Sequence, residues 1–377
     1  MGSLRAMESA AALPTGVAIA ELLDWRPEFG VVTVCVGIDP GDRGKGWLIE
    51  LRNQLKGAVE PADDGHDRGR GLRAAAQRIL DRFDEEELPS GRCQIGFCEA
   101  IDDRRARDIW SGAQMDGFRT SASYGDRARL TPLLKLLDEG APIGVVAVSA
   151  ERIHLYEWKL GSLELVHDWE AEMYSLDWRE RKAAKPSDMA RTQGAASSGR
   201  DQYDQRLEHN RARFLEETGR LTADEARNRS WRRVIGFGDP EHVREFDEGA
   251  EKGTDVELAE AVDVIPEERG KLLERVNAAV AEGNRRRELT LIERAVEGAR
   301  TAGGHGALGL IDVQRSLNEG RVELLLFDAD TQDSELADLE DEIVERAIRT
   351  SAMIKPVERE AAEVLREHGG VAAVLRY

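Results

Sequence analysis

Three strand-like runs follow one another between residues 144 and 170. They read GVVAVSA, RIHLYEWKLG and SLELVHDWE, and only short turns separate them. Neighbouring strands joined this tightly must be antiparallel, because a parallel pair needs a long crossover connection. The sequence therefore predicts an antiparallel meander near the start of a domain.

The segments after the meander complete this domain. Residues 183–199 are rich in Ala, Ser, Gly and Lys without periodicity, which predicts a loop. A long helix is expected from about residue 200 to residue 230, and WRRVIGFG predicts one more strand, ended by Asp239 and Pro240. We therefore expect a middle domain over residues 141–262.

The flanking parts predict two further domains. A chain of 377 residues suits two or three domains. Residues 1–140 alternate strand-like runs (VVTVCVGI, CQIGFCEA) with helical ones (GWLIELRNQLKGAV, LRAAAQRILDRF). Residues 263–377 combine helices with the strand-like RVELLLFDAD, and nine acidic residues without a basic one run from Asp328 to Glu345. The predicted fold class is α/β, of mixed α+β type, in three domains.

Net charge distinguishes one segment from the rest. The whole chain carries a formal charge of −20, and such an average disfavours a polyanionic partner. Residues 178–233 nevertheless carry +5, whereas residues 234–377 carry −15. Any contact with nucleic acid is therefore expected in the segment 178–233.

The basic segment combines a loop with an arginine-bearing helix. Arg206, Arg213 and Arg220 lie seven residues apart, so they recur on one helical face. A basic loop followed by such a helix suits RNA phosphates. The alternative is that these arginines pair with acidic neighbours such as Glu208 and Glu216 on a solvated face. The candidate RNA-binding residues are Lys182, Lys185, Arg191, Gly199, Arg200, Arg206, Arg213 and Arg220.

Motifs for catalysis or metal binding do not occur in the contexts that they need. The histidines show no metal-ligand spacing. The pattern Gly304-x-Gly306-x-x-Gly309 follows a helical run rather than a strand, so it reads as a loop between helices instead of a dinucleotide site. Cys93 and Cys98 read as buried structural thiols. We expect no metal and no cofactor.

Localisation follows from composition and from the N-terminal sequence. No run of about 18 apolar residues occurs, which argues against a transmembrane helix. The N-terminus lacks a basic region followed by a long apolar run, so no signal peptide is expected. Three cysteines suit reduced thiols. We therefore expect a cytoplasmic protein without a membrane partner.

The order of four segments resembles that of bacterial relatives of the archaeo-eukaryotic class-1 release factor and Pelota. They are LTPLLKLLDEGAPIGVVAVSAERIHLYEWKLG, the basic loop with its helix, GLIDVQRSLNEGRVELLLF and the terminal GGVAAVLRY. The resemblance covers residues 130–377. It implies a divergent N-terminal domain, an RNase-H-like middle domain and a C-terminal α/β domain similar to a ribosomal protein.

The resemblance also implies a partner and a position for the basic loop. Members of the family bind the ribosomal A site, and the middle-domain loop reaches the peptidyl-transferase centre. Hydrolytic members carry Gly-Gly-Gln in that loop. This sequence has no Gly-Gly-Gln, and its nearest counterpart, Gly199-Arg200-Asp201-Gln202, contains an aspartate that phosphates would repel. We therefore expect a factor for ribosome hibernation or rescue that does not hydrolyse an ester.

Three alternatives remain open at this point. One is an active peptidyl-tRNA hydrolase that uses Gln202 as its catalytic residue. Another is a stress adaptor whose acidic C-terminal domain binds proteins without RNA. A third is a metal-dependent nuclease, for which the strands of the middle domain offer Glu151, Glu157, Glu164 and Asp168. An elongation-factor-Tu-like GTPase is a further partner that the resemblance suggests.

Overall fold

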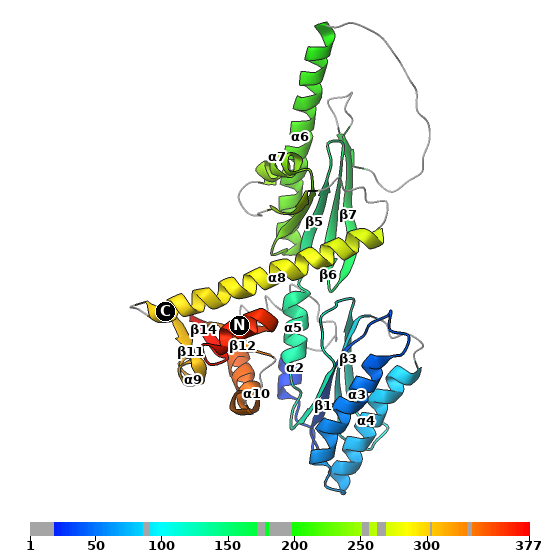
Figure 1. Ribbon diagram of the computed structural model, residues 1–377, viewed down its shortest axis with the longest axis vertical. Helices are drawn as coiled ribbons and strands as arrows, with labels where there is room; N and C mark the ends of the chain where they lie inside the picture. Colours follow the sequence, from blue (N-terminus) through cyan, green and yellow to red (C-terminus); the bar gives the residue numbers. More distant parts are fainter. Residues whose placement is uncertain are drawn as a thin grey trace. The chain divides into compact units, whose positions relative to one another are not determined.

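The computed structural model describes most of the 377 residues. The described ranges are 19–85, 91–171, 178–180, 198–250, 256–261, 269–301, 304–329 and 334–377. They form two compact units, and Figure 1 shows their elements in sequence colours. The first unit contains residues 1–140 together with residues 281–377, and the second contains residues 141–280.

The N-terminal sheet of the first unit is antiparallel. Its central strand β1 (Val31–Gly37) pairs with β2 (Cys93–Glu99) on one side and with β4 (Ser121–Gly125) on the other. Strand β3 (Asp108–Ala113) extends the sheet beyond β2. Six of the seven residues of β1 are buried, which fits its almost continuous apolar sequence.

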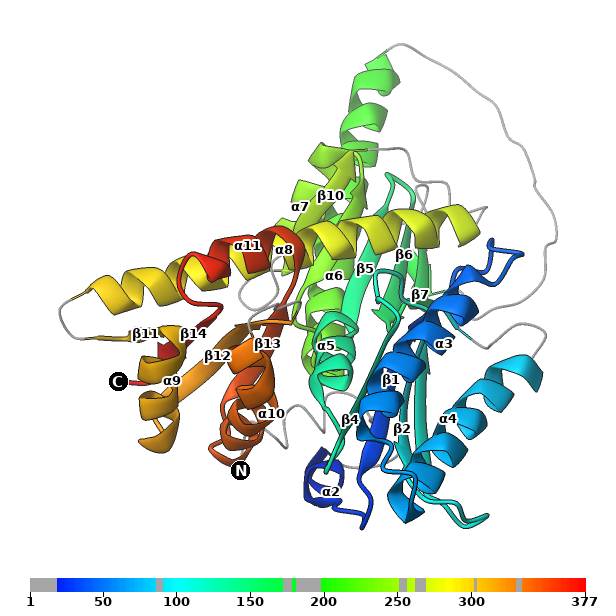
Figure 2. The same cartoon turned by 60° about the horizontal axis from the view of Figure 1, so that its bottom comes forward.

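Two helices cover one face of this sheet, and Figure 2 shows them side by side. Helix α3 (Gly46–Val59) buries Leu48, Leu51 and Leu55, whose spacing places them on one stripe. Helix α4 (Asp67–Glu85) buries Leu72, Ile79 and Phe83 against the same core. The shorter helices of this part are α2 (Ile19–Asp24), the 3-10 turn η1 (Glu60–Ala62) and α5 (Thr131–Glu139).

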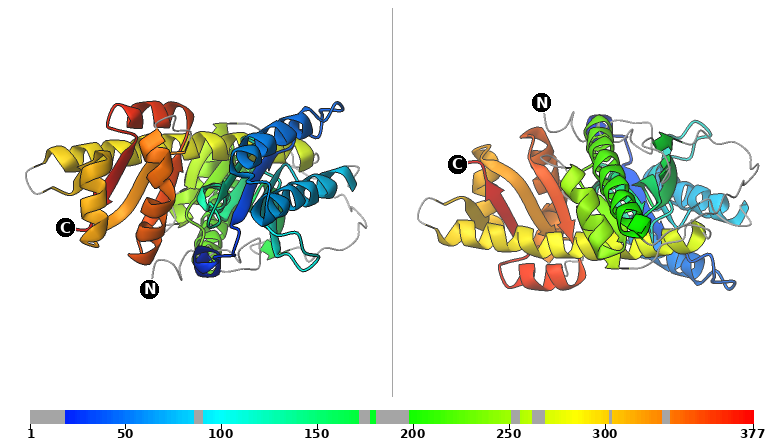
Figure 3. Two further views of the ribbon diagram at one scale, coloured as in Figure 1. Left: turned by 90° about the horizontal axis from the view of Figure 1, so that it is seen from below. Right: turned by 90° about the horizontal axis from the view of Figure 1, so that it is seen from above.

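The C-terminal sheet of the first unit has the strand order β11-β14-β12-β13. Helices α8 and α11 pack on one face through Ile292, Ala295 and Leu365. Helices α9 and α10 lie on the other face, so the sheet is the middle layer of three (Figure 3). The elements are α8 (Arg269–Arg300), β11 (Gly306–Leu308), α9 (Gly309–Asn318), β12 (Val322–Asp328), α10 (Ser334–Arg349), β13 (Met353–Val357), α11 (Arg359–Arg366) and β14 (Val371–Leu375).

The second unit is built on a six-stranded mixed sheet with the order β10-β9-β5-β6-β7-β8. Strands β5 to β8 form an antiparallel meander, while β9 and β10 run parallel to β5. The bounds are β5 (Ile143–Val148), β6 (Arg152–Lys159), β7 (Ser162–Ala171), β8 (Trp178–Glu180), α6 (Ser198–Arg229), β9 (Val234–Gly238), α7 (Pro240–Ala250) and β10 (Val256–Ala261).

Both faces of the six-stranded sheet are covered. On one face, Phe214 of α6 and Phe246 of α7 pack against Ile153 and Leu155 of β6. On the other face, the first turns of α8 approach the sheet, where the Trp158 indole donates a 2.8 Å hydrogen bond to the Asn277 side chain. The central strands are therefore buried on both sides.

The predicted mixed α/β class is confirmed, with three sheets in the described residues. The meander, helix α3 and strand β12 lie where the sequence predicts them. The glycine motif at 304–309 differs from its prediction, because the short strand β11 stands between the helices and Gly309 begins α9 with a φ of +74°. All three cysteines are buried and free, as expected of structural thiols.

The acidic run of the C-terminal part is not simply solvated surface. Asp328 is 1% exposed and accepts hydrogen bonds from the Arg366 guanidinium, at 2.6 Å and 3.2 Å. Glu340 is 2% exposed and is bound by Arg129 and by the Thr131 hydroxyl. Much of the run lies in helix α10, where the described carboxylates Glu340, Glu342 and Glu345 have partners in the first unit.

Candidate nucleic-acid interface

Helix α6 is the element that carries the predicted RNA-binding face. Its buried stripe includes Phe214, Leu215 and Thr218, and the Thr218 hydroxyl donates a hydrogen bond to the Phe214 carbonyl. The helix ends where Ser230 adopts a left-handed φ of +56° and the Trp231 N–H bonds back to the Ala226 carbonyl at 2.9 Å. The stripe fixes which face of α6 is turned to solvent.

Two of the predicted RNA-binding arginines lie on that exposed face. The side chain of Arg213 is 53% exposed and forms an ion pair with Glu217 at 3.0 Å. The side chain of Arg220 is 64% exposed and pairs with Glu216 at 3.7 Å. Both are therefore accessible to a polyanion and are at the same time paired within the helix, as the alternative interpretation expected.

The row of arginines extends beyond the predicted set. Arg227 follows Arg220 by seven residues, is exposed, and pairs with Asp224. The sequence period of seven already contained this signal, but the prediction stopped at Arg220. Pairs of this kind contribute little to stability when they are exposed, on the order of 0.3–0.5 kcal/mol each. Phosphates could therefore displace them at low cost.

Other predicted residues lie outside the described part of the molecule. Lys182, Lys185 and Arg191 precede the first described residue of α6. The same holds for the side chains of Arg200, Gln202 and Arg206, whose backbone is described as helix. Their roles stay predictions.

The counterpart of Gly-Gly-Gln lies within α6 rather than before it. The helix begins at Ser198, so Gly199, Arg200, Asp201 and Gln202 belong to its first turns. The first four N–H groups of a helix have no partner inside the helix. The N–H of Gln202, as the fifth, is expected to bond to the carbonyl of residue 198.

Two of the four strand carboxylates considered for a nuclease, Asp168 and Glu157, are engaged in ion pairs and hydrogen bonds. Asp168 accepts two hydrogen bonds from Arg152, at 2.9 Å and 2.7 Å, and its nearer oxygen lies 3.5 Å from His154 Nε2. Glu157 accepts a 2.8 Å hydrogen bond from the Trp231 indole. Within the described residues, no three His, Cys, Asp or Glu side chains gather as metal ligands would.

Two histidines sit against acidic partners in this domain. Burial lowers the pKa of His154, although the nearby Asp168 opposes the shift. His167 stacks on Trp169 with ring centroids 4.9 Å apart and lies 3.4 Å from Glu225. Burial alone would raise the pKa of Glu225, but Arg229 and His167 outweigh it and the pKa is lowered. These contacts tie α6 to β7.

A sequence comparison finds a similar family for the middle segment of the chain. Residues 142–268 match the profile of bacterial archaeo-eukaryotic release factor family 5. This segment, about a third of the chain, is similar to the bacterial relatives of the archaeo-eukaryotic release factors. The match coincides with the meander, α6 and the following strands, which we call the release-factor-like domain (residues 142–268). The resemblance seen in the sequence is confirmed for residues 142–268. No curated protein sequence matches this one.

Three solved structures are similar to this chain at low sequence identity. An archaeal translation termination factor, aRF1, is 18% identical over 98% of both chains, with a TM-score of 0.27. Archaeoglobus fulgidus Pelota is 16% identical over 75% of this chain and 79% of its own, with a TM-score of 0.34. S. cerevisiae Dom34, a translation termination-like factor, is 9% identical over 76% and 79%, with a TM-score of 0.42.

Proposed function

We propose that this protein is a ribosome-associated factor of hibernation or rescue, which occupies the A site without hydrolysing the peptidyl-tRNA ester. One observation carries the proposal: the release-factor-like domain has no Gly-Gly-Gln, and Asp201 and Gln202 stand in its place at the start of α6. A carboxylate beside RNA phosphates is unfavourable. A Gln202 N–H that donates its hydrogen bond to the carbonyl of residue 198 is not available to stabilise an oxyanion.

Binding is proposed to rest on the basic segment. Residues 178–233 carry +5 in a chain of −20, and Arg213 and Arg220 are exposed on α6. Each phosphate contact releases counterions, so affinity for the ribosome should fall steeply with salt. Lys182, Lys185, Arg191, Arg200 and Arg206 complete the proposed RNA-binding set.

Co-sedimentation with 70S ribosomes tests the proposal. We expect the full chain to pellet at low salt, and the variant Arg206→Glu/Arg213→Glu/Arg220→Glu to stay in the supernatant. A control variant reverses Arg244 on α7, which is exposed and forms an ion pair with Glu248 at 3.9 Å. Failure of the folded wild-type protein to pellet would refute the proposal.

A peptide-release assay separates this function from the hydrolase alternative. Stalled ribosomes that carry labelled peptidyl-tRNA should keep their label in the presence of the protein. Release that disappears in Gln202→Ala would instead establish an active hydrolase. The amount of the protein that co-sediments with ribosomes from growing and from starved cells would then distinguish rescue of stalled ribosomes from hibernation.

The adaptor alternative makes the opposite prediction for the charge-reversal variant. A protein that binds its partner through the acidic C-terminal part should retain that partner when the three arginines of α6 are reversed. The ribosome-bound factor should lose the ribosome and, with it, any elongation-factor-Tu-like GTPase that joins the complex there. Affinity capture of both variants from the same cells compares the two.

A further inference from the structure

Two of the three cysteines are neighbours on one face of the N-terminal sheet. Cys35 of β1 lies opposite Ile95, and Cys93 of β2 lies opposite Gly37, so the two cysteines are diagonal partners across the ladder. Because Gly37 has no side chain, no side chain of β1 lies directly opposite Cys93. The β1 side chain that Cys93 meets is therefore that of Cys35.

The two thiols are in direct contact. The hydrogen bond between them is the largest cause that raises the pKa of Cys93 well above its ordinary value, and burial raises it further. A hydrogen bond that raises a pKa favours the protonated form, so the Cys93 thiol is the donor and the Cys35 sulfur accepts. Two sulfur atoms that share a hydrogen bond are close enough for one to attack the other once it has been oxidised.

Access from outside distinguishes Cys35 from Cys93. Cys35 lines a cavity of about 380 Å³ in the first unit, whereas Cys93 is 0% exposed and does not line it. One water molecule takes up roughly 30 Å³ in the liquid, so a reagent as small as hydrogen peroxide has ample room there. Ser121 of β4 lies opposite Cys35 and lines the same cavity, and its hydroxyl group can form hydrogen bonds with such a reagent.

We propose that Cys35 and Cys93 are a reversible oxidation site, at which hydrogen peroxide converts the two thiols into a disulfide. The Cys35 sulfur gives up its proton and attacks one peroxide oxygen. The O–O bond breaks, a sulfenic acid forms on Cys35, and the leaving hydroxide takes up the proton and becomes water. The Cys93 sulfur then attacks the Cys35 sulfur, and the S–O bond breaks with loss of a second water that carries the Cys93 proton. Two thiols and one peroxide thus give one disulfide and two water molecules.

The disulfide would join two neighbouring strands at either end of the segment that contains α3 and α4. Diagonal partners lie further apart than residues directly opposite each other, so closing the bond draws β1 and β2 together at this point. Such strain makes a disulfide easier to reduce, which suits a reversible modification. The site does not depend on ribosome binding.

Cys98 is a matched control within the same strand. It is five residues from Cys93, so its side chain points to the opposite face of β2 and packs with Val32 and Leu72 in the core beneath α3 and α4. It is 0% exposed and does not line the cavity, and burial raises the pKa of its thiol. We therefore expect Cys98 to remain reduced when the other two cysteines are oxidised.

Mass spectrometry of the full chain after treatment with hydrogen peroxide tests the site. The folded protein is oxidised first, and the remaining thiols are then alkylated in denaturant. We expect the wild type to lose two hydrogen atoms and to retain one alkylated cysteine, Cys98, with peptide mapping that locates the bond between Cys35 and Cys93. Dithiothreitol should restore three alkylated cysteines.

Three variants assign the roles of the thiols. Cys93→Ser should stop at the sulfenic acid, which dimedone traps on Cys35. Cys35→Ser should yield neither a disulfide nor a dimedone adduct. Cys98→Ser should form the disulfide as the wild type does, and thermal unfolding verifies that each variant is folded.

Any of three results would overturn the proposal. They are a folded wild type that keeps three reduced thiols under conditions that oxidise the urea-unfolded chain, a disulfide that includes Cys98, and a disulfide that still forms in Cys35→Ser. The wild-type peptide map decides the first two even if a variant does not fold. Because the readout is the covalent state of the isolated protein, its failure is distinguishable from a failure of ribosome pelleting.

Discussion

Lys355 shows at the residue scale how the N-terminal and C-terminal parts of the chain are joined. It lies on β13 and is 3% exposed, and its Nζ lies 2.6 Å from Asp138 of α5 and 2.9 Å from Glu288 of α8. Burial alone would lower the pKa of Lys355, but Asp138 and Glu288 outweigh it and the pKa is raised. The lysine is therefore charged, and it compensates the negative charges of two largely buried carboxylates.

We expect Lys355→Met to lower the free energy of unfolding by about 3–5 kcal/mol, because it leaves buried carboxylates unpaired. Urea unfolding at neutral pH measures this loss. The control Lys56→Met removes an exposed lysine that pairs with Glu60 at 3.6 Å, and should change stability by less than about 0.5 kcal/mol. Equal effects of the two substitutions would contradict the assigned role of Lys355.

Glu139 lies in the same buried cluster and gives a prediction about pH. Burial raises the pKa of its carboxyl above the ordinary 4.5, although Lys135 and Lys355 oppose the shift. A group whose folded pKa is raised contributes stability below its unfolded pKa and loses that contribution as the pH rises through the folded value. Glutamine cannot ionise and avoids this loss.

The variant Glu139→Gln should therefore gain stability relative to the wild type as the pH rises above 4.5, the ordinary pKa of a glutamate carboxyl. Urea unfolding of both proteins at each pH gives the difference. The exposed Glu50 of α3 offers the control substitution Glu50→Gln. If the stability of Glu139→Gln relative to the wild type fell with rising pH, the pKa of Glu139 would be lowered rather than raised in the folded protein.

At the scale of elements, α6 and α7 pack through two glycines. A Cβ on Gly219 would lie 2.1 Å from the Phe246 carbonyl oxygen, and a Cβ on Gly249 would lie 2.1 Å from the Glu216 carbonyl oxygen. Each distance is far below van der Waals contact, and the obstacles are backbone atoms. The two helices can approach this closely only because both positions lack a side chain.

Gly219→Ala should destabilise the release-factor-like domain by about 1–3 kcal/mol, because the clash outweighs the better helix propensity of alanine. The matched control is Gly57→Ala in α3, where nothing lies within 4 Å of the added Cβ. There we expect a gain of about 0.5–1 kcal/mol. Chemical denaturation of both variants gives the sign of the change in the free energy of unfolding. A Gly219→Ala variant that is more stable than the wild type would rule out the close packing.

Elements whose apolar residues form a continuous run or recur at helical spacing were predictable from the sequence. Strand β1 is almost wholly apolar, and α3 has leucines at helical spacing, so their bounds were predicted closely. Strands β3 and β4 were missed because DIWSGA and SASYG are short and only partly buried. Helix α10 was missed because its acidic run concealed Ile343, Val344 and Ala347, which form its buried stripe.

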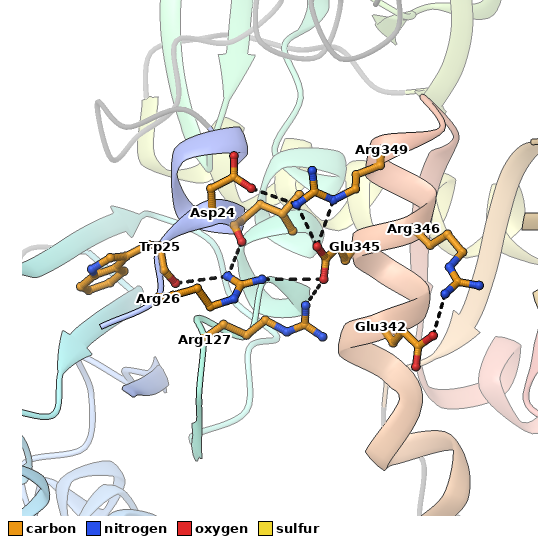
Figure 4. Close-up of polar contacts among 9 residues, drawn as sticks. Asp24, Trp25, Arg26, Arg127, Glu342, Glu345, Arg346 and Arg349 are labelled. Atoms are coloured by element: carbon orange, nitrogen blue, oxygen red, sulfur yellow. Dashed lines mark hydrogen bonds and ion pairs between the residues drawn. The ribbon is translucent and has the colours of Figure 1, made fainter. Parts of the chain in front are cut away.

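At the scale of the whole molecule, a second cluster of ion pairs lies within the first unit (Figure 4). Glu345 of α10 is bound by Arg127 and by Arg349 at 2.9 Å, and Arg26 lies 3.8 Å away. Arg349 also reaches Asp24 of α2 at 2.9 Å. No sequence pattern revealed the contacts of Glu345 with Arg127 or of Arg349 with Asp24, because pairing across more than 200 residues leaves no local periodicity.

Charge reversal tests the cluster around Glu345. We expect Arg127→Glu to lower the free energy of unfolding by about 1–3 kcal/mol, since it places two carboxylates together in a half-buried site. The double variant Arg127→Glu/Glu345→Arg should recover part of that loss, and the recovery should shrink at high salt. Additive effects of the two single changes would show that Arg127 and Glu345 do not interact.

None of the helices in the described ranges combines the length and the apolar character that crossing a bilayer requires.

The division of the chain into two units has a consequence for the order in which they fold during synthesis. The second unit is made of one continuous segment. The first unit cannot be completed until its C-terminal segment has been synthesised, because Asp138 and its partner Lys355 are 217 residues apart. At roughly 5–20 residues per second, a ribosome needs about 10–45 s to make that interval. For that time the nascent N-terminal part exposes the surface of α5 and the arginines before it, which β13 and α10 later contact, and chaperones can bind it there.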